Sequence, residues 1–145
     1  MSKLRGNDNP VPQGKYVPAS RFGDIIYTAG MTPRKNGELI QVGKVLSEEP
    51  ISTYKEAVRQ AAVNALTAAR NTLTDQESLK QILSLTVYIN AEETFSGHAG
   101  IADFASEYLY ENLGDAGIGS RAAIGVASLP GNAPVEVQII AAVIS

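Results

Sequence analysis

The sequence predicts an α+β fold in which two helices cover one face of a single mixed β-sheet. Two observations carry this prediction. The order of predicted elements along the 145 residues is strand, strand, helix, strand, helix, strand, strand. The last two predicted strands are apolar on both faces, although two helices cannot cover both faces of a five-stranded sheet. We therefore expect other copies of the chain to bury the second face of the sheet.

The N-terminal part is predicted to begin with an irregular arm. Residues 1 to about 20 are polar and contain three prolines, so we expect no regular structure there, and residues 1–15 form the arm itself. Residues 24–30 have β-branched and aromatic side chains bounded by glycine, which indicates a strand. Asn36-Gly37 is a strong two-residue hairpin turn because both residues tolerate positive φ, and a short strand over residues 38–42 should follow it.

The rest of the chain alternates helices and strands. Residues 53–73 carry apolar side chains at helical spacing, and their many alanines would let the helix lie close to a sheet. A second helix over residues 95–113 is expected to end at Gly114, a typical C-terminal cap. The predicted strands are residues 82–89, residues 120–128 and residues 135–144.

Composition narrows the classes of function. The chain is expected to form one domain over residues 1–145, without a linker or internal repeat. With 15 acidic and 12 basic residues, its net charge of −3 argues against nucleic acid as a partner. It has no cysteine and a single histidine, His98, so we expect no disulfide and no metal site. Neither a signal peptide in Met1–Asp8 nor an apolar run of membrane-spanning length is visible, so we expect a cytoplasmic protein that does not bind membranes.

Two isolated charges in the apolar C-terminal strands are the strongest candidates for chemistry. Arg121 is the one charged residue in a run of small and apolar side chains, and Glu136 is isolated in the next strand. A guanidinium is costly to desolvate without an anion, so Arg121 is a candidate carboxylate binder and Glu136 a candidate acid that handles water. The alternative is that both face solvent or form a structural ion pair. A plain hairpin would separate them by roughly 20 Å, so a shared site needs another pairing or a subunit interface.

The spacing of these residues resembles a known family. Gly119-Ser120-Arg121-Ala122-Ala123-Ile124-Gly125-Val126, then Leu129-Pro130, then Val135-Glu136-Val137, is similar to the C-terminal motif of the Rid family, also called YjgF/YER057c/UK114-like proteins or reactive intermediate (enamine/imine) deaminases. Upstream, Tyr16-Val17 and Ile25-Ile26-Tyr27-Thr28-Ala29-Gly30 resemble the N-terminal strands of that family. The resemblance extends from about Tyr16 to Val143.

The resemblance implies a chorismate-mutase-like fold and a homotrimer with clefts between subunits. It also implies hydrolysis of 2-enamine or 2-imino acids to 2-oxo acids and ammonium, without metal or organic cofactor. Arg121 would hold the substrate carboxylate and Glu136 would position water, while Tyr16, Ala29, Gly30 and Ala123 would line the cleft. The best-studied branch carries Ser and Cys where this chain has Ala29 and Ala123.

Two other functions stay open at this point. The loss of polar groups at Ala29 and Ala123 favours a trimer that binds or senses a small carboxylate without turning it over. Some relatives are described as endoribonucleases, which the acidic net charge and the single histidine argue against.

Overall fold

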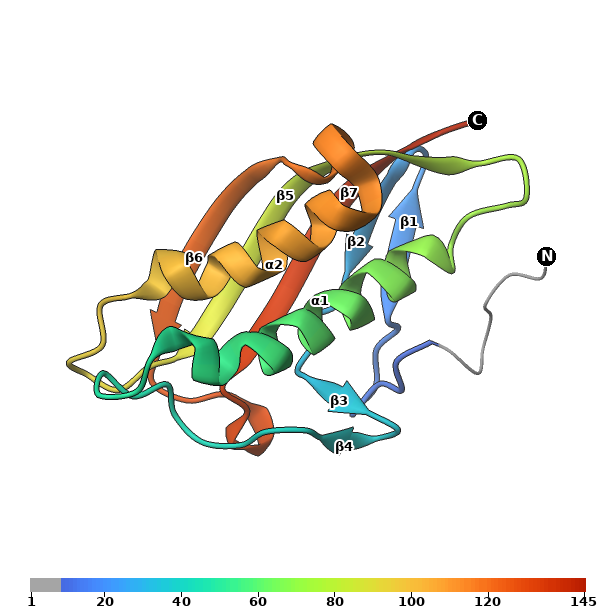
Figure 1. Cartoon of the computed structure of the whole chain (residues 1–145). Helices are drawn as coiled ribbons and strands as arrows, with labels where there is room; N and C mark the ends of the chain where they lie inside the picture. The colour runs from blue at the N-terminus through green and yellow to red at the C-terminus, as the bar shows by residue number, and fades with distance from the viewer. Residues whose placement is uncertain (1–8) are drawn as a thin grey trace.

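The computed structural model describes residues 9–145, so Met1–Asp8, the start of the expected arm, lie outside the described residues. A five-stranded mixed sheet has the order β1-β2-β7-β5-β6, and two helices cross one of its faces (Figure 1). The sheet strands are β1 (Ala19–Phe22), β2 (Ile25–Thr28), β5 (Ser78–Asn90), β6 (Ser120–Val126) and β7 (Val135–Ile144). The helices are α1 (Lys55–Arg70) and α2 (His98–Leu113), with short 3₁₀ turns η2 (Ile51–Tyr54), η3 (Gly114–Gly117) and η4 (Pro130–Asn132).

The pairing of the C-terminal strands corrects the hairpin considered from sequence. β6 and β7 follow each other along the chain, but β5 lies between them. β5 runs parallel to β6, with Leu85 opposite Arg121, and antiparallel to β7, with Tyr88 opposite Glu136. This arrangement puts the longest strand between the other two C-terminal strands.

The core lies between the sheet and the two helices, as the apolar stripes predict. α1 presents a row of alanines that are fully buried, which lets its backbone approach β7 closely. β7 alternates strictly, with its odd-numbered residues buried under the helices and its even-numbered residues on the other face. α2 ends at Leu113 and is followed by Gly114, whose φ of 64° confirms the predicted glycine cap.

Two predicted elements at the N-terminal side are corrected. β1, which pairs with β2, lies in the segment that was expected to be irregular up to about residue 20. Its signal was missed because only four residues separate Pro18 from the tight turn at Gly23, where φ is 61°. The Asn36-Gly37 turn is confirmed, with φ of 56° and 85°. Its strands β3 (Arg34–Lys35) and β4 (Glu38–Leu39) form a separate two-stranded sheet rather than part of the main one.

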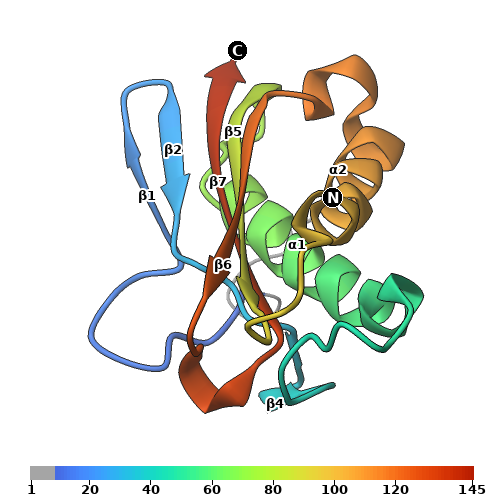
Figure 2. The same cartoon turned by 90° about the vertical axis from the view of Figure 1, so that its left-hand side faces the viewer.

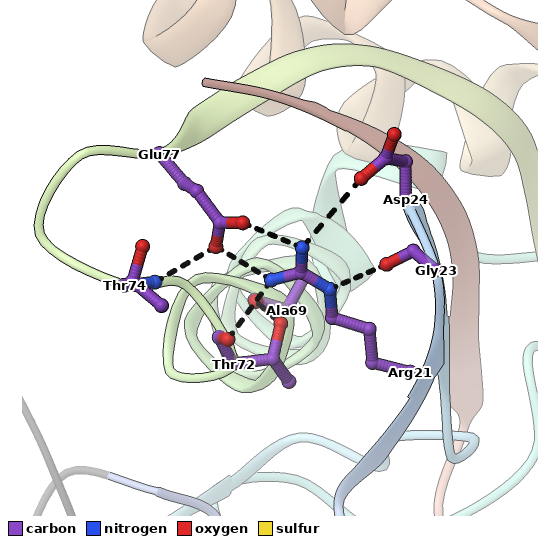
Figure 3. Close-up of polar contacts among 7 residues, drawn as sticks. All are labelled: Arg21, Gly23, Asp24, Ala69, Thr72, Thr74 and Glu77. Atoms are coloured by element: carbon purple, nitrogen blue, oxygen red, sulfur yellow. Dashed lines mark hydrogen bonds and ion pairs between the residues drawn. The ribbon is translucent and has the colours of Figure 1, made fainter.

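A partly buried ion pair joins the β1–β2 hairpin to the loop before β5 (Figure 3). The guanidinium of Arg21 donates to both carboxylate oxygens of Glu77, at 2.6 and 2.7 Å, and to the carbonyl oxygens of Thr72 and Gly23. The hydrogen bonds from Arg21, joined by one from the backbone N–H of Thr74, lower the pKa of Glu77 to about 2. The bidentate geometry fixes the outer strand against the end of α1.

Both helices lie on one side of the sheet, which leaves its other face uncovered (Figure 2). That face carries exposed apolar side chains. The register puts Phe22, Tyr27 and Ile140 on this face, which we call the open face, and Ile124 lies on it at the β6 edge. Phe22 is 86% exposed and Tyr27 is 49% exposed. An apolar face of this kind fits the expectation that other copies of the chain cover it. Within residues 9–145, no helix is both long and apolar enough to cross a membrane.

Candidate functional site

Four of the predicted site residues line one cavity. Tyr16, Ala29, Gly30 and Glu136 border a pocket of about 440 Å³, which we call the Glu136 pocket. Tyr16 precedes β1, Ala29 and Gly30 follow β2, and Glu136 lies at the start of β7. The pocket lies beside the open face, because Glu136 is an even-numbered residue of β7. Its remaining lining residues are Gln13, Thr32, Arg34 and Pro130.

Gly30 lies against the side chain of Glu136. Met31 and Val137 exchange two hydrogen bonds, N–H to carbonyl, of 2.7 and 2.8 Å. In this antiparallel pair Gly30 lies opposite Gln138 and diagonally across from Glu136, whose side chain reaches back over Gly30 at the mouth of the pocket. A Cβ at position 30 would overlap Oε2 of Glu136 and would lie 2.7 Å from its Cδ. The carboxyl group thus rests on the bare Cα of Gly30, a position that no other residue type leaves free.

The carboxyl group of Glu136 is partly removed from water, and residues 9–145 supply no cationic partner for it. Burial raises the pKa of Glu136 above its ordinary value, because desolvation disfavours the charged form. Among residues 9–145 no ion pair is formed by Glu136, so nothing offsets that cost. An acid with a raised pKa at the wall of a cavity is a candidate for proton transfer.

The arm residues close one side of the same pocket. The backbone N–H of Ala29 donates to the carbonyl oxygen of Pro18 at 2.8 Å, which ties the arm to the end of β2. Tyr16 is half exposed, and its hydroxyl accepts a hydrogen bond from the backbone N–H of Gln13 at 3.1 Å. Ala29 lines the pocket and has no polar side-chain group. At this wall, hydrogen bonds to a ligand would therefore come from backbone groups and from neighbouring side chains.

Arg121 lies elsewhere, under helix α2. Its Nη1 donates to Oδ1 of Asp103 at 2.7 Å and to the hydroxyl of Ser106 at 3.1 Å. Its Nη2 makes a longer contact of 3.5 Å with the carbonyl oxygen of Ala99. The Arg121 side chain is 27% exposed and that of Asp103 is 55% exposed. Within one chain Arg121 therefore forms an ion pair, as the structural alternative predicts, but with Asp103 rather than with Glu136.

Arg121 and Glu136 are on opposite faces of the sheet. Arg121 is opposite the buried, helix-facing Leu85, whereas Glu136 is opposite Tyr88, three residues further along β5. Two strand spacings and three residue steps separate their Cα atoms by about 14 Å. Ala123 shares the helix-facing side with Arg121. One chain therefore does not bring the two predicted catalytic residues together, and the predicted site divides into the Glu136 pocket and the β6 edge.

Sequence reasoning missed the second charge in the Glu136 pocket. Arg34 sits on β3 and lines this cavity with Glu136, and its Nη1 donates to the carbonyl oxygen of Gly37 at 2.9 Å. The hairpin turn at Asn36-Gly37 was recognised, but nothing in its local pattern shows which way the preceding arginine points. Only the three-dimensional fold shows that Arg34 and Glu136 line the same cavity.

The described part of the chain holds no cluster of metal-binding side chains. Within residues 9–145, no group of three or more His, Cys, Asp or Glu side chains is arranged to hold a metal ion. His98 stacks obliquely on Phe95, with ring centroids 5.2 Å apart, and lies against Gly125. This placement gives His98 a packing role.

Comparison with known proteins identifies the family. The model of the family described as Endoribonuclease L-PSP matches residues 6–143, nearly the whole chain. The chain belongs to this family. It is the YjgF/UK114 family, so the resemblance seen in the C-terminal motif is confirmed.

Individual relatives support the fold. Protein TCP17 of Trypanosoma cruzi is 26% identical over 128 residues, which are 88% of this chain and 80% of that protein. Atu1372 from Agrobacterium tumefaciens, a protein of unknown function, is 27% identical with a TM-score of 0.84, over 93% of this chain and 87% of that one. Escherichia coli TdcF, solved with bound serine, is 19% identical with a TM-score of 0.69 over 98% of both chains. The α+β arrangement of a mixed sheet and two helices is therefore the fold of this family.

Proposed function

We propose that this protein hydrolyses 2-enamine and 2-imino acids to 2-oxo acids and ammonium, in a homotrimer whose sites lie between subunits. The observation that carries the proposal is the carboxyl group of Glu136, which rests on Gly30 at the wall of a cavity large enough for a small organic acid. Family membership adds support, as does a relative, TdcF, that was solved with bound serine.

Glu136 would act as general base and then as general acid. Its carboxylate takes a proton from a water molecule while the water oxygen bonds to C2 of the imine and the C=N electron pair moves to nitrogen. Glu136 returns this proton to the nitrogen, which gives a neutral carbinolamine. In its collapse Glu136 takes the hydroxyl proton and passes it to the nitrogen, the electron pair left on oxygen forms the C=O bond, the C–N bond breaks, and ammonia leaves. Ammonia takes up a further proton from water to become ammonium. A positioned base of this kind contributes about a hundredfold to ten-thousandfold in rate.

Arg121 would hold the substrate carboxylate from a neighbouring subunit. The contacts with Asp103 and Ser106 use Nη1, which leaves the Nε–Nη2 edge with one long contact to Ala99. A carboxylate can bind that edge side-on through two N–H donors. Asp103 and Ser106 thus fix the plane of the guanidinium at the edge strand β6, where a second copy of the chain can approach.

The open face supplies the reason for assembly. Its apolar side chains, among them Phe22, Tyr27 and Ile124, are left uncovered by the two helices. Packing such faces around a three-fold axis would remove them from water and bring the β6 edge of one copy near the Glu136 pocket of the next. In this arrangement Arg121 of one copy meets Glu136 of the next, although the two residues are about 14 Å apart within one chain.

A carboxylate-binding trimer without turnover is the second candidate. Two observations favour it: Ala29 and Ala123 offer no side-chain polar group, and Arg121 is neutralised by Asp103 within its own chain. Endoribonuclease activity, which the family description names, is less well supported, because the net charge of −3 does not favour a polyanionic substrate.

The deciding experiment couples the protein to an amino-acid oxidase and follows trapping of the imine with semicarbazide. The wild-type protein should lower the trapped imine and raise the 2-oxo acid, whereas Arg121→Ala and Glu136→Gln should not. Arg59→Ala is the matched control, because it removes an arginine that pairs with Glu111 on the helix surface. Tight binding of a 2-oxo acid without any effect on the imine would establish the second candidate instead.

A further inference from the structure

Arg34 has an unused capacity to bind an anion inside the Glu136 pocket. Its Nη1 is held by the carbonyl oxygen of Gly37, but its Nε is buried without a hydrogen-bond partner. Among residues 9–145, Arg34 forms no ion pair, although it lines the same cavity as the carboxyl group of Glu136. A buried donor that lacks a partner at a cavity wall indicates that something outside the chain supplies the acceptor.

A second cavity continues from the first. It has a volume of about 520 Å³ and shares Gln13, Tyr16, Gly30, Thr32 and Arg34 with the Glu136 pocket, so the two are neighbours. The described residues around it include Arg34 and Lys35 as cations, several amide side chains, and no aspartate or glutamate. Its electrostatic character therefore favours a negatively charged group.

Arg34 is held in place by the helix beneath it. The side-chain amide of Asn64 donates to the carbonyl oxygens of Thr32 and Arg34, at 3.1 and 2.9 Å, and Gln60 donates to Asn64 at 3.0 Å. On the other side, a Cβ at Gly131 would lie 3.4 Å from Nη2 of Arg34. The guanidinium thus spans from the hairpin to the segment that precedes β7. The backbone of Arg34 is anchored by Asn64 and its Nη1 by the carbonyl oxygen of Gly37, so the side chain loses less entropy when it binds a ligand.

We propose that Arg34 binds a carboxylate on the substrate side chain, so that the preferred substrates are 2-imino acids with an acidic side chain. This inference rests on the proposed function for the reacting end of the molecule. Glu136 serves the imine carbon and Arg121 of a neighbouring copy holds the carboxylate next to it, while Arg34 holds the second carboxylate where the two cavities meet. The geometry accounts for two arginines with separate tasks.

The test compares acidic with neutral substrates in wild type and Arg34→Gln. The 2-imino acids are generated by an oxidase from glutamate and from 2-aminobutanoate, and kcat/KM is measured for each. We expect wild type to prefer the acidic substrate, and Arg34→Gln to reduce that preference about tenfold to a hundredfold while sparing the neutral one. Retained turnover of the neutral substrate also shows that the variant is folded. Arg59→Gln, on the helix surface, should leave the preference unchanged.

Binding measurements separate this inference from the proposed function. Calorimetry with 2-oxoglutarate and 2-oxobutanoate reports on the second carboxylate even if no imine is hydrolysed. Tighter binding of 2-oxoglutarate that is lost in Arg34→Gln supports the inference in that case. Equal affinity of wild type for the two acids would overturn it. An equal loss of both substrates in folded Arg34→Gln would also overturn it, because Arg34 would then hold the carboxylate common to all substrates.

Discussion

Replacement of Gly30 by alanine should disable Glu136 without unfolding the protein. The added methyl group would overlap Oε2 of Glu136 and lie 2.7 Å from Cδ, so the carboxyl group must move. The backbone of Gly30 is not among those with positive φ, so alanine is tolerated there. The displaced atoms belong to the end of a flexible side chain, and a change of rotamer costs about 0.5–1.5 kcal/mol. That cost corresponds to a fall in Tm of only a few degrees, about 2–4 °C per kcal/mol.

The loss of activity should be far larger than the loss of stability. Removing a positioned general base lowers the rate about a hundredfold to ten-thousandfold, and Gly30→Ala should lose activity in that range. Movement of the carboxyl group into solvent should also lower the pKa of Glu136, because burial is what raises it. Residual activity should therefore persist to lower pH than in wild type, since the group acts as a base only above its pKa.

The assay is imine hydrolysis in a double-mutant cycle with Glu136→Gln, alongside thermal melts. If Gly30 acts through Glu136, then Gly30→Ala should cause little further loss in the Glu136→Gln background. Full activity of Gly30→Ala, or additive losses in the double variant, would refute this reasoning. A large fall in Tm would show that the methyl group displaces backbone rather than the carboxyl group.

Three further substitutions test neighbouring parts of the account. Asp103→Asn keeps an acceptor for Arg121 but removes the competing charge, so calorimetry should show about two- to fivefold tighter binding of 2-oxobutanoate; weaker binding would contradict the role given to Asp103. Glu77→Gln should lower Tm at neutral pH. Arg21 lowers the pKa of Glu77 to about 2, so the ion pair stabilises the folded state fully above about pH 4.5 and loses this effect as pH falls toward 2. The Tm values of wild type and Glu77→Gln should therefore converge at low pH. A difference in Tm that persists there would contradict the role of the pair. Asn64→Ala leaves two backbone carbonyl groups without their donor, so urea unfolding should show a loss of about 1–2 kcal/mol, whereas an unchanged midpoint would mean that water replaces the amide.

The sequence predicts the layers of this fold but not how its strands are joined. Periodicity located both helices and the strands β5 and β7, because each buries one regular stripe or face. β6 was located from its apolar residues, although it is largely exposed in one chain. It did not reveal that β5 separates β6 from β7, because pairing depends on contacts between segments far apart in the chain. The short strand β1 was missed because four residues between a proline and a tight turn carry too little pattern.

The candidate site was predicted in composition better than in geometry. The family resemblance named Tyr16, Ala29, Gly30, Ala123 and Glu136 as site residues, and their functional roles stay predictions. In the structure all of these except Ala123 line one pocket, whereas Ala123 lies on β6. Arg121 was expected near Glu136, yet strand parity puts it on the opposite face of the same chain. Its partner Asp103 went unrecognised because a helix turn and a strand edge meet only in three dimensions.

The sharing of one site between two copies of the chain is the central claim, and mixing two inactive variants tests it most directly. Arg121→Ala and Glu136→Gln proteins are unfolded together and refolded, so that subunits mix. Each pure variant should be inactive, while the mixture should regain about a quarter of wild-type imine hydrolysis, because one site in four combines an intact Arg121 with an intact Glu136 from the next copy. A mixture no more active than its parents, although it elutes as the mixed oligomer, would contradict the account.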